Sequence, residues 1–144
     1  MRPHFLTSHV SLLIAASAAS ASSPITHHSS LLAAIREVET GGQPRGGRDT
    51  RGDSGRSLGP YQVQRSYWRD AGIPGRYDQV RDPSYARDVI EAYWRKHCPA
   101  ALRRGDLQTL ARTHNGGPAG PHKRSTIGYW HRVRRQLTRD RGEH

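Results

Sequence analysis

Two carboxylic acids stand where they could do acid–base chemistry on a single bond. Glu39 ends an apolar-striped segment just before a glycine pair, and Asp53, fourteen residues later, lies in a glycine- and arginine-rich stretch. A partly buried carboxyl group at a helix end has a raised pKa, which suits a general acid. A carboxylate among arginines and glycine N–H groups stays ionised. Cleavage of a glycosidic bond uses one acid of each kind, so the pair predicts glycoside chemistry.

Other interpretations of these acids remain open. Asp49 lies in the same loop as Asp53 and competes with it for the role of second carboxylate. An Asp-Ser-Gly sequence is also common in plain turns, and an isolated helical glutamate is most often an ordinary solvated residue. Glu37, two residues before Glu39, points elsewhere and is interpreted as a surface residue.

Five further residues have side chains suited to holding a sugar, because amides, phenols and aromatic faces bind sugar hydroxyls and rings. These candidate substrate-binding residues are Tyr61, Gln62, His114, Asn115 and Trp130. A helix start with core aromatics, or a plain helix end at a glycine pair, explains the same residues structurally. The histidines and the cysteine form no zinc-binding pattern, so the sequence predicts no metal site and no cofactor.

The hydrophobic pattern predicts the elements that must position these residues. Leu31 to about Glu39 forms one helix, capped by Ser29 or Ser30 and ended by two glycines. Residues 43–59 form a loop or small hairpin. Four more helices follow, over 60–71, over 83–97, after Asp106 up to residues 115–116, and from Ser125 or Thr126 onward. The prediction is therefore an α+β, predominantly helical fold of about five helices with a small Gly-rich β-hairpin lobe.

The length, net charge and cysteine content of the chain limit the class of protein that it can be. The chain has 144 residues, enough for one domain, and a formal net charge of +11. Such a surface attracts polyanions, which include nucleic acids, anionic lipids and the acidic polymers of a bacterial cell wall. Cys98 is the single cysteine, so no intramolecular disulfide can form and the core must stabilise the fold.

The N-terminal residues resemble an export signal. An apolar, small-residue stretch from Val10 to Ala19 precedes an Ala-Ser-Ala sequence that fits the cleavage rule of signal peptidase. The stretch is short and broken by serines, which argues against a membrane anchor. We therefore expect a signal peptide over 1–21, a flexible leader over 22–30, a folded domain over 31–137 and a basic tail over 138–144. The expected location is secreted or periplasmic.

Three ordered motifs together resemble a known family, the invertebrate-type lysozymes, which include destabilase. The first motif is Glu-Val-Glu-Thr-Gly-Gly over 37–42. The second is Asp53 followed by Ser-Leu-Gly-Pro-Tyr-Gln-Val over 57–63 and Ser-Tyr-Trp over 66–68. The third joins residues 111–120 (Ala-Arg-Thr-His-Asn-Gly-Gly-Pro-Ala-Gly) to Gly-Tyr-Trp over 128–130. The similarity covers roughly residues 31–137.

The resemblance implies a lysozyme-like fold and a muramidase activity. It makes Glu39 the general acid and Asp53 the second catalytic carboxylate. The family cleaves the β-1,4 bond between N-acetylmuramic acid and N-acetylglucosamine with retention of configuration. The expected substrate is therefore peptidoglycan or a chitin-like oligosaccharide, and we expect the protein to act as a monomer without a specific nucleic-acid partner.

The chain departs from the family in three respects. Animal members are rich in disulfides, whereas this chain can form none within itself, so it resembles a cysteine-poor, bacterial-like branch. The loop before Gly59 is one residue shorter, which keeps Asp49 open as an alternative. Some members are isopeptidases that pair a serine with a lysine or histidine. Lys96 and Lys123 are the chain's only lysines, and we expect neither to lie near a motif, which argues against that activity.

Three other functions compete with hydrolysis. A non-catalytic, cationic wall-binding module would use the same aromatic and basic residues, with both acids structural. A nucleic-acid binder would explain the charge alone. A lytic transglycosylase would use one acid and release an anhydro product, so it would not need Asp53.

Overall fold

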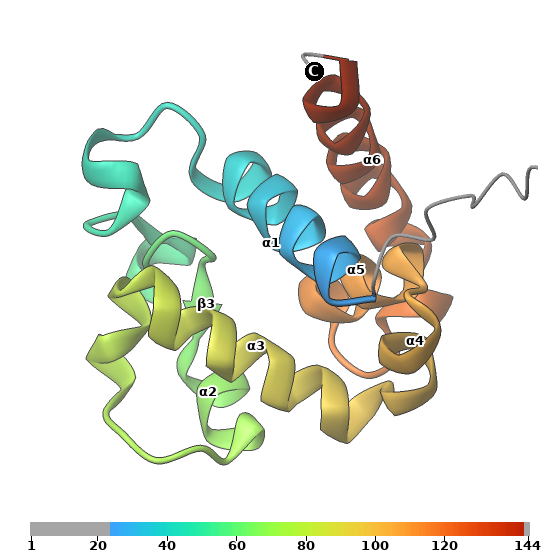
Figure 1. Cartoon of the computed structure of the whole chain (residues 1–144). Helices are drawn as coiled ribbons and strands as arrows, with labels where there is room; N and C mark the ends of the chain where they lie inside the picture. The colour runs from blue at the N-terminus through green and yellow to red at the C-terminus, as the bar shows by residue number, and fades with distance from the viewer. Residues whose placement is uncertain (1–23, 143–144) are drawn as a thin grey trace, which may run out of the picture.

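The computed structural model describes residues 24–142, and the elements below are those of this range. Most of it is helical, with one small sheet (Figure 1). The α-helices are α1 Pro24–Thr40, α2 Arg65–Ala71, α3 Pro83–His97, α4 Pro99–Arg104, α5 Leu107–Gly116 and α6 Ile127–Gly142. The strands are β1 Arg51–Gly52, β2 Ser57–Leu58 and β3 Val63–Gln64. Short 3-10 turns are Pro44–Gly47, Asp53–Gly55, Tyr77–Arg81, Gly120–His122 and Arg124–Thr126.

Helix α1 is the central helix of the fold, and it carries Glu39 in its last turn. Leu31, Leu32 and Ile35 are fully buried, and burial of each such side chain stabilises the fold by about 1.5–3 kcal/mol. The helix ends at Thr40, before the glycine pair, as predicted, and Gly42 has a φ of 78°. Its start differs from the prediction, because the helix begins at Pro24 and not at Leu31.

The segment 22–30 was therefore wrongly predicted as a leader over most of its length, since 24–30 is the first part of α1. Proline is well tolerated at the first position of a helix, where its fixed φ suits the helix and its missing N–H costs nothing. The predicted signal peptide, 1–21, lies outside the described residues.

The small lobe is a three-stranded antiparallel sheet in the order β1-β2-β3, one strand more than the predicted hairpin. Arg51 lies opposite Leu58 in the first pair, and Ser57 lies opposite Gln64 in the second. The third strand occupies part of the segment that we predicted as a helix from Pro60. Gln62 has a φ of 51°, which no α-helix contains, and this turn reverses the chain so that α2 begins only at Arg65.

Local start and stop signals account for the remaining helices. Helix α3 runs over the predicted residues, and the Asp82 side chain caps it by accepting from the N–H groups of Ser84 and Tyr85. Helix α5 is capped by Asp106 and ends at Gly116, also as predicted. The sequence analysis missed the short helix α4, which brings the total to six. Helix α6 continues to Gly142, so the predicted basic tail is helical over 138–142.

The helices pack around one apolar core, to which α3 contributes six buried residues. Trp94 is fully buried, and its Nε1 donates a 3.0 Å hydrogen bond to the carbonyl of Leu110, which ties α3 to α5. Val133 and Leu137 bury the inner face of α6 against α1. Cys98 is half-buried and free. Within the described range, no helix is long and apolar enough to cross a membrane.

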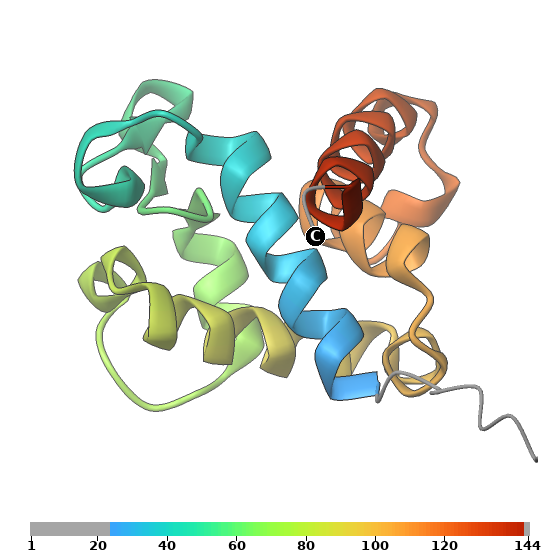
Figure 2. The same ribbon diagram turned by 45° about the horizontal axis from the view of Figure 1, so that its top comes forward.

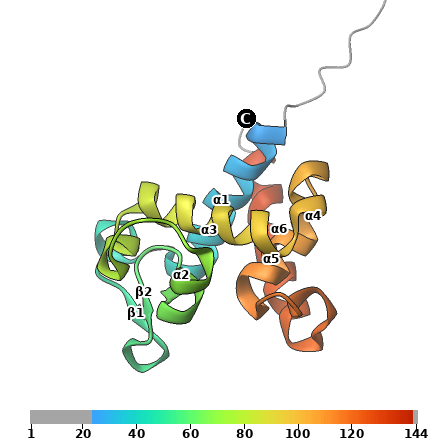
Figure 3. The same cartoon turned by 90° about the horizontal axis from the view of Figure 1, so that it is seen from below.

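The elements fall into two groups with a cleft between them. The sheet and α2 lie on one side, and α4, α5 and α6 lie on the other (Figure 3). Helix α3 reaches from one group to the other, and α1 crosses the middle of the molecule (Figure 2). This arrangement brings the last turn of α1, the loop of the sheet and the end of α5 to a common cleft.

Candidate functional site

The cleft between the two groups of elements contains both acids that the sequence analysis selected. Its volume is about 550 Å³, and its walls are mostly polar. Glu39 contributes from α1, Asp53 from the turn after β1, and His114 from α5. The other lining residues are Ser57, Gln62, Gln64, Ser66, Tyr67, Asp70, Tyr93, Asn115, Gly116, Gly117 and Lys123.

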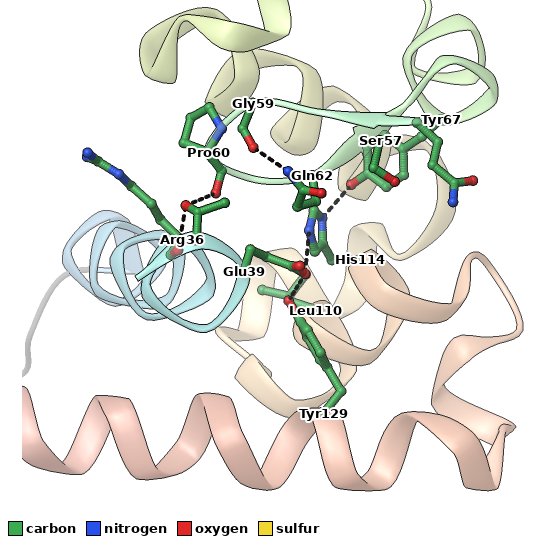
Figure 4. Close-up of polar contacts among 12 residues, drawn as sticks. Arg36, Glu39, Ser57, Gly59, Pro60, Gln62, Tyr67, Leu110, His114 and Tyr129 are labelled. Atoms are coloured by element: carbon green, nitrogen blue, oxygen red, sulfur yellow. Dashed lines mark hydrogen bonds and ion pairs between the residues drawn. The ribbon is translucent and has the colours of Figure 1, made fainter. Parts of the chain in front are cut away.

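The carboxyl group of Glu39 is buried at the inner wall of the cleft, with 19% of its side chain exposed. Its Oε1 accepts a 2.9 Å hydrogen bond from the hydroxyl of Tyr129, on α6 (Figure 4). Burial raises the pKa of Glu39 to about 7, while the Tyr129 hydrogen bond and the charge of Arg132 oppose the rise and the charge of Asp53 adds to it. A large fraction of Glu39 is therefore protonated at neutral pH, as a general acid requires.

His114 is a second titratable neighbour of Glu39 and is itself buried, at 8% exposure. Burial lowers its pKa to about 4, so the imidazole is neutral at neutral pH. Its Nε2 lies 3.9 Å from Oε1 of Glu39, too far for a hydrogen bond, and its Nδ1 lies 3.3 Å from the hydroxyl of Tyr67. His114 thus forms a buried, uncharged part of the cleft wall beside the acid.

Asp53 has the opposite environment. Its carboxylate accepts a 2.7 Å hydrogen bond from Ser57 Oγ and a 3.1 Å bond from Gln64 Nε2. The Ser57 bond, then the Gln64 bond, lower its pKa below the ordinary value, so Asp53 stays ionised. The strand register explains the pair of donors, because Ser57 and Gln64 are direct cross-strand partners in β2 and β3.

Asp49, the alternative second carboxylate, lies outside the cleft lining. Its Oδ2 forms a 3.0 Å ion pair with Arg45, and both side chains are exposed. Asp53 is therefore the better candidate, since it shares one cleft with Glu39 and also contributes to the pKa of that acid.

The five predicted sugar-binding residues are divided by the structure. Gln62, His114 and Asn115 line the cleft. Tyr61 does not: it is 3% exposed and borders two grooves beside Arg36. Trp130 also lies outside the cleft lining and packs, partly buried, against the hydrophobic core. Tyr61 and Trp130 therefore pack with the hydrophobic core, which was the alternative explanation for these aromatic residues.

The sequence analysis missed several residues of the site. Tyr129 stood within the Gly-Tyr-Trp motif, yet its neighbour Trp130 was selected. Tyr67 and Tyr93 stack with their ring centroids 3.7 Å apart and contribute aromatic surface to the cleft wall. An alternation of polar residues along β2 and β3 could have indicated the donors to Asp53, but the third strand was not predicted.

A third carboxylate and a lysine also line the cleft. Asp70, at the end of α2, is held by hydrogen bonds from Lys96 and His97, of which the Lys96 bond contributes most to lowering its pKa. Lys123 donates a 2.6 Å hydrogen bond to the Gly116 carbonyl. The expectation that neither lysine lies near a motif is wrong for Lys123, which lines the cleft beside Gly116 and Gly117.

The described residues contain no group of three or more histidine, cysteine or acidic side chains suited to a metal ion. The acids of the cleft are held by hydroxyl, amide and ammonium donors. The chemistry that this site offers is proton transfer by Glu39 together with a fixed negative charge at Asp53.

Comparisons with known proteins show which proteins this chain is similar to. No protein-family model matches the chain. Lysozyme 1 of Crassostrea virginica is 34% identical over 108 residues, which are 73% of this chain and 57% of that protein. Invertebrate-type lysozyme 2 of Caenorhabditis elegans is 35% identical over 86 residues, 51% of this chain and 62% of that protein. The chain thus spans about three fifths of the length of these curated relatives.

A solved structure shows the same fold. In the crystal structure of Meretrix lusoria lysozyme in complex with PliI of Aeromonas hydrophila, the lysozyme superposes with a TM-score of 0.60 at 32% identity, covering 74% of this chain and 87% of that one. The helical body, the small sheet and the cleft between them define a lysozyme-like α+β fold. Within that class, the chain belongs to the invertebrate-type lysozyme family.

Proposed function

We propose that this protein is a muramidase that hydrolyses the β-1,4 bond between N-acetylmuramic acid and N-acetylglucosamine. The observation that carries the proposal is the contrast between two acids in one cleft. Glu39 is buried and has a pKa of about 7, whereas Asp53 is exposed and hydrogen-bonded, with a lowered pKa. Environments that separate the pKa values of two neighbouring carboxyl groups assign one the role of acid and the other the role of anion.

The proposed reaction uses the two acids in sequence. Protonated Glu39 donates its proton to the leaving glycosidic oxygen while Asp53 attacks or shields the anomeric carbon. Glu39 then removes a proton from the water that completes hydrolysis. Where Asp53 attacks, a bond forms between its carboxylate and the anomeric carbon, and the water then displaces that carboxylate. This double displacement retains the configuration and requires carboxyl groups about 5–5.5 Å apart. Tyr129 keeps the Glu39 carboxyl aimed into the cleft through its 2.9 Å hydrogen bond.

The cleft wall supports a polysaccharide substrate. Gln62 and Asn115 offer amide groups to sugar hydroxyls, and Tyr67 and Tyr93 offer aromatic surface. Gly116 and Gly117 let the sugar approach the backbone closely. Peptidoglycan is the substrate that agrees with the family, and a chitin-like oligosaccharide offers the same β-1,4 bond. We propose that the protein is exported, acts as a monomer and has a bacteriolytic, antimicrobial role, in which its net charge of +11 attracts it to an anionic envelope.

The test is the clearing of a peptidoglycan suspension by the chain from residue 22 onward, which includes every described residue. Glu39→Gln should abolish clearing, with a loss of roughly 10²–10⁴-fold in rate. Asp78→Asn is the matched control, because it removes an exposed carboxylate that pairs with Arg76 outside the cleft. Equal clearing by the parent and Glu39→Gln would mean that the acid is misassigned or that lysis is merely cationic.

The products separate hydrolysis from its alternatives. Hydrolysis adds water, so mass spectrometry should detect reducing muramic ends. Anhydro ends would identify a lytic transglycosylase. A folded protein that binds the wall without releasing fragments would be a binding module.

A further inference from the structure

A second concave region lies beside α1, away from the catalytic cleft. Two adjoining grooves there share three residues, Arg36 of α1, Tyr61 and Arg87 of α3. Neither groove is lined by Glu39 or Asp53, so this region is separate from the acids of the cleft. The Arg36 side chain points away from the Glu39 carboxyl (Figure 4).

Arg36 is held in place by the loop that follows α1. A Cβ atom on Gly46 would lie within 2.1 Å of Nη2 of Arg36, so the guanidinium group packs directly against the Gly46 backbone. Gly46 has a φ of +62°, a conformation that side-chain-bearing residues rarely adopt. The guanidinium group of Arg36 thus occupies the space that a Cβ atom on residue 46 would take.

Arg87 reaches the same grooves from α3. Its Nη2 donates a 3.3 Å hydrogen bond to Ser29 Oγ, which tethers the side chain to α1. Both arginines are half-buried, and neither forms an ion pair with any residue in the described part of the chain. Two half-buried guanidinium groups without a carboxylate partner leave several strong donors directed at the groove.

Tyr61 lines the same two grooves as the two arginines. Its ring is buried, yet it borders both grooves, and its hydroxyl makes no hydrogen bond to another described residue. Burial raises the pKa of Tyr61, while the charges of Arg87 and Arg36 oppose the rise, which places both guanidinium groups within electrostatic range of the ring. The phenol therefore remains a neutral donor.

The acids that border these grooves do not neutralise the arginines by contact. Glu37 is exposed, and its Oε1 curls back against Gly41. Glu91 lies 3.8 Å from Arg95, with which it pairs. Asp88 lines one of the two grooves and is exposed, and it forms no ion pair with Arg36 or Arg87. The donors of Arg36 and Arg87 are thus left for a ligand.

We propose that Arg36, Arg87 and Tyr61 form a binding site for the phosphate groups of a phosphodiester-linked polyanion. A phosphate presents more acceptor oxygens than a carboxylate and can bridge two guanidinium groups that approach from different helices. Because the two grooves adjoin at these three residues, the polymer could extend into one groove on each side of the bound phosphate. The site lies outside the cleft, so it can bind such a polymer while a glycan occupies the catalytic acids.

The experiment titrates the full chain with poly(glycerol phosphate) and measures the binding affinity by isothermal titration calorimetry. The double variant Arg36→Gln/Arg87→Gln should weaken binding by about tenfold or more, because it removes charge-assisted hydrogen bonds of about 1.5–3 kcal/mol each. The matched control is Arg103→Gln/Arg104→Gln, which removes the same charge from exposed residues of α4. It should change the affinity by less than about twofold, because it alters only the long-range field.

Further arms test the ligand chemistry. Inorganic phosphate should bind the same site more weakly than the polymer, and polyglutamate of similar length should not bind it measurably. Tyr61→Phe should weaken polymer binding by a smaller factor than the arginine pair, and it provides a second variant should the double variant unfold.

Three results would overturn the proposal. Equal losses in both double variants would show diffuse charge attraction. Inorganic phosphate that binds as tightly as the polymer would make the free ion the ligand. Polyglutamate that binds as tightly would remove the preference for phosphate. None of these outcomes depends on catalysis, so each is independent of the muramidase assay.

Discussion

The hydroxyl of Tyr129 donates a 2.9 Å hydrogen bond to Oε1 of Glu39, across 90 residues of sequence. Tyr129 is 3% exposed, so its own hydroxyl is removed from water, and its pKa is raised well above 10, first by burial and then by the charge of Glu39. The tyrosine thus remains a neutral donor. It fixes the orientation of the acid while favouring its ionised form, and burial outweighs that effect.

Tyr129→Phe should move the basic limb of the pH–activity profile to higher pH. The hydrogen bond lowers the pKa of Glu39, so its loss raises that pKa further above about 7 and extends the range in which the acid is protonated. The rate at the optimum should fall by about tenfold or less, the worth of one hydrogen bond of about 1.4 kcal/mol.

Two arginine variants on α6 serve as controls for this shift. Arg132→Gln should move the basic limb in the same direction, because the charge of Arg132 also lowers the pKa of Glu39. Arg134→Gln, which removes an exposed charge from the same helix, should leave the limb in place. A Tyr129→Phe profile that coincides with that of the parent would show that the hydrogen bond does not tune the acid.

Asp53→Asn should lower kcat by roughly 10²-fold or more, because the developing positive charge of the transition state loses its ionised partner. Asp49→Asn removes an equal charge from the same loop, but Asp49 is exposed, paired with Arg45 and outside the cleft. Its rate should stay within about twofold of the parent, as surface ion pairs contribute little. Steady-state hydrolysis of a soluble wall fragment measures both. The reverse order of losses would make Asp49 the second carboxylate.

Ser57→Ala should move the acidic limb of the same profile upward. The Ser57 hydrogen bond is the largest contribution that lowers the pKa of Asp53, so its removal lets Asp53 protonate at higher pH. Gln64→Ala should act in the same direction and more weakly, since its bond is the second contribution. An unchanged acidic limb in Ser57→Ala would mean that ionised Asp53 does not control this limb.

The sequence predicts helices well wherever the start and stop signals are local. Asp82 and Pro83 mark the start of α3, and Asp106 marks that of α5, because capping depends on residues within one turn. The third strand was missed for a different reason. Tyr61 and Trp68, seven residues apart, fit one face of a helix, and the positive φ of Gln62 that breaks such a helix has no sequence signature in a residue other than glycine.

The sequence could select Glu39 and Asp53 as candidates because each lies beside a distinctive glycine pattern, but it could not predict their environments. Glu39 acquires its raised pKa from burial under α5 and α6, and its partner Tyr129 lies at the far end of the chain. Asp53 acquires its donors from the register of two strands. Such contacts depend on tertiary structure, which explains why Trp130 was selected and its neighbour overlooked.

Gly59→Ala should destabilise the protein by about 2–3 kcal/mol. Gly59 has a φ of +76°, and a Cβ there would lie 2.4 Å from the backbone carbonyl oxygen of Val80, so the main chain would have to move. Gly55→Ala is the matched control, since Gly55 has a φ of +88° but a Cβ would meet nothing within 4 Å. Gly55→Ala should lower the free energy of unfolding by only about 1 kcal/mol, which is the strain of the positive φ. Urea unfolding measures the difference, and equal costs would contradict the steric argument.

The neighbours Glu39 and His114 should have opposite effects on the pH dependence of stability. The pKa of Glu39 rises from 4.5 to about 7 on folding, so the folded state binds more protons and stability falls as the pH rises between these values. The pKa of His114 falls from 6.5 to about 4, so the folded state binds fewer protons and stability is lost as the pH falls through this range. Between about pH 4.5 and 6.5 the two slopes cancel.

Replacing either residue should therefore reveal how the other makes the free energy of unfolding depend on pH. In Glu39→Gln, the free energy of unfolding should rise from pH 4 to 6.5, by up to about 3 kcal/mol, since each pKa unit corresponds to about 1.4 kcal/mol. In His114→Gln, it should fall between about pH 4.5 and 7 by a similar amount. Urea unfolding at half-unit pH steps measures both against the parent, whose curve should be flatter than either. Parallel curves for all three proteins would mean that these two groups titrate in the folded state as they do in the unfolded chain, and the buried acid would then have no raised pKa with which to donate its proton.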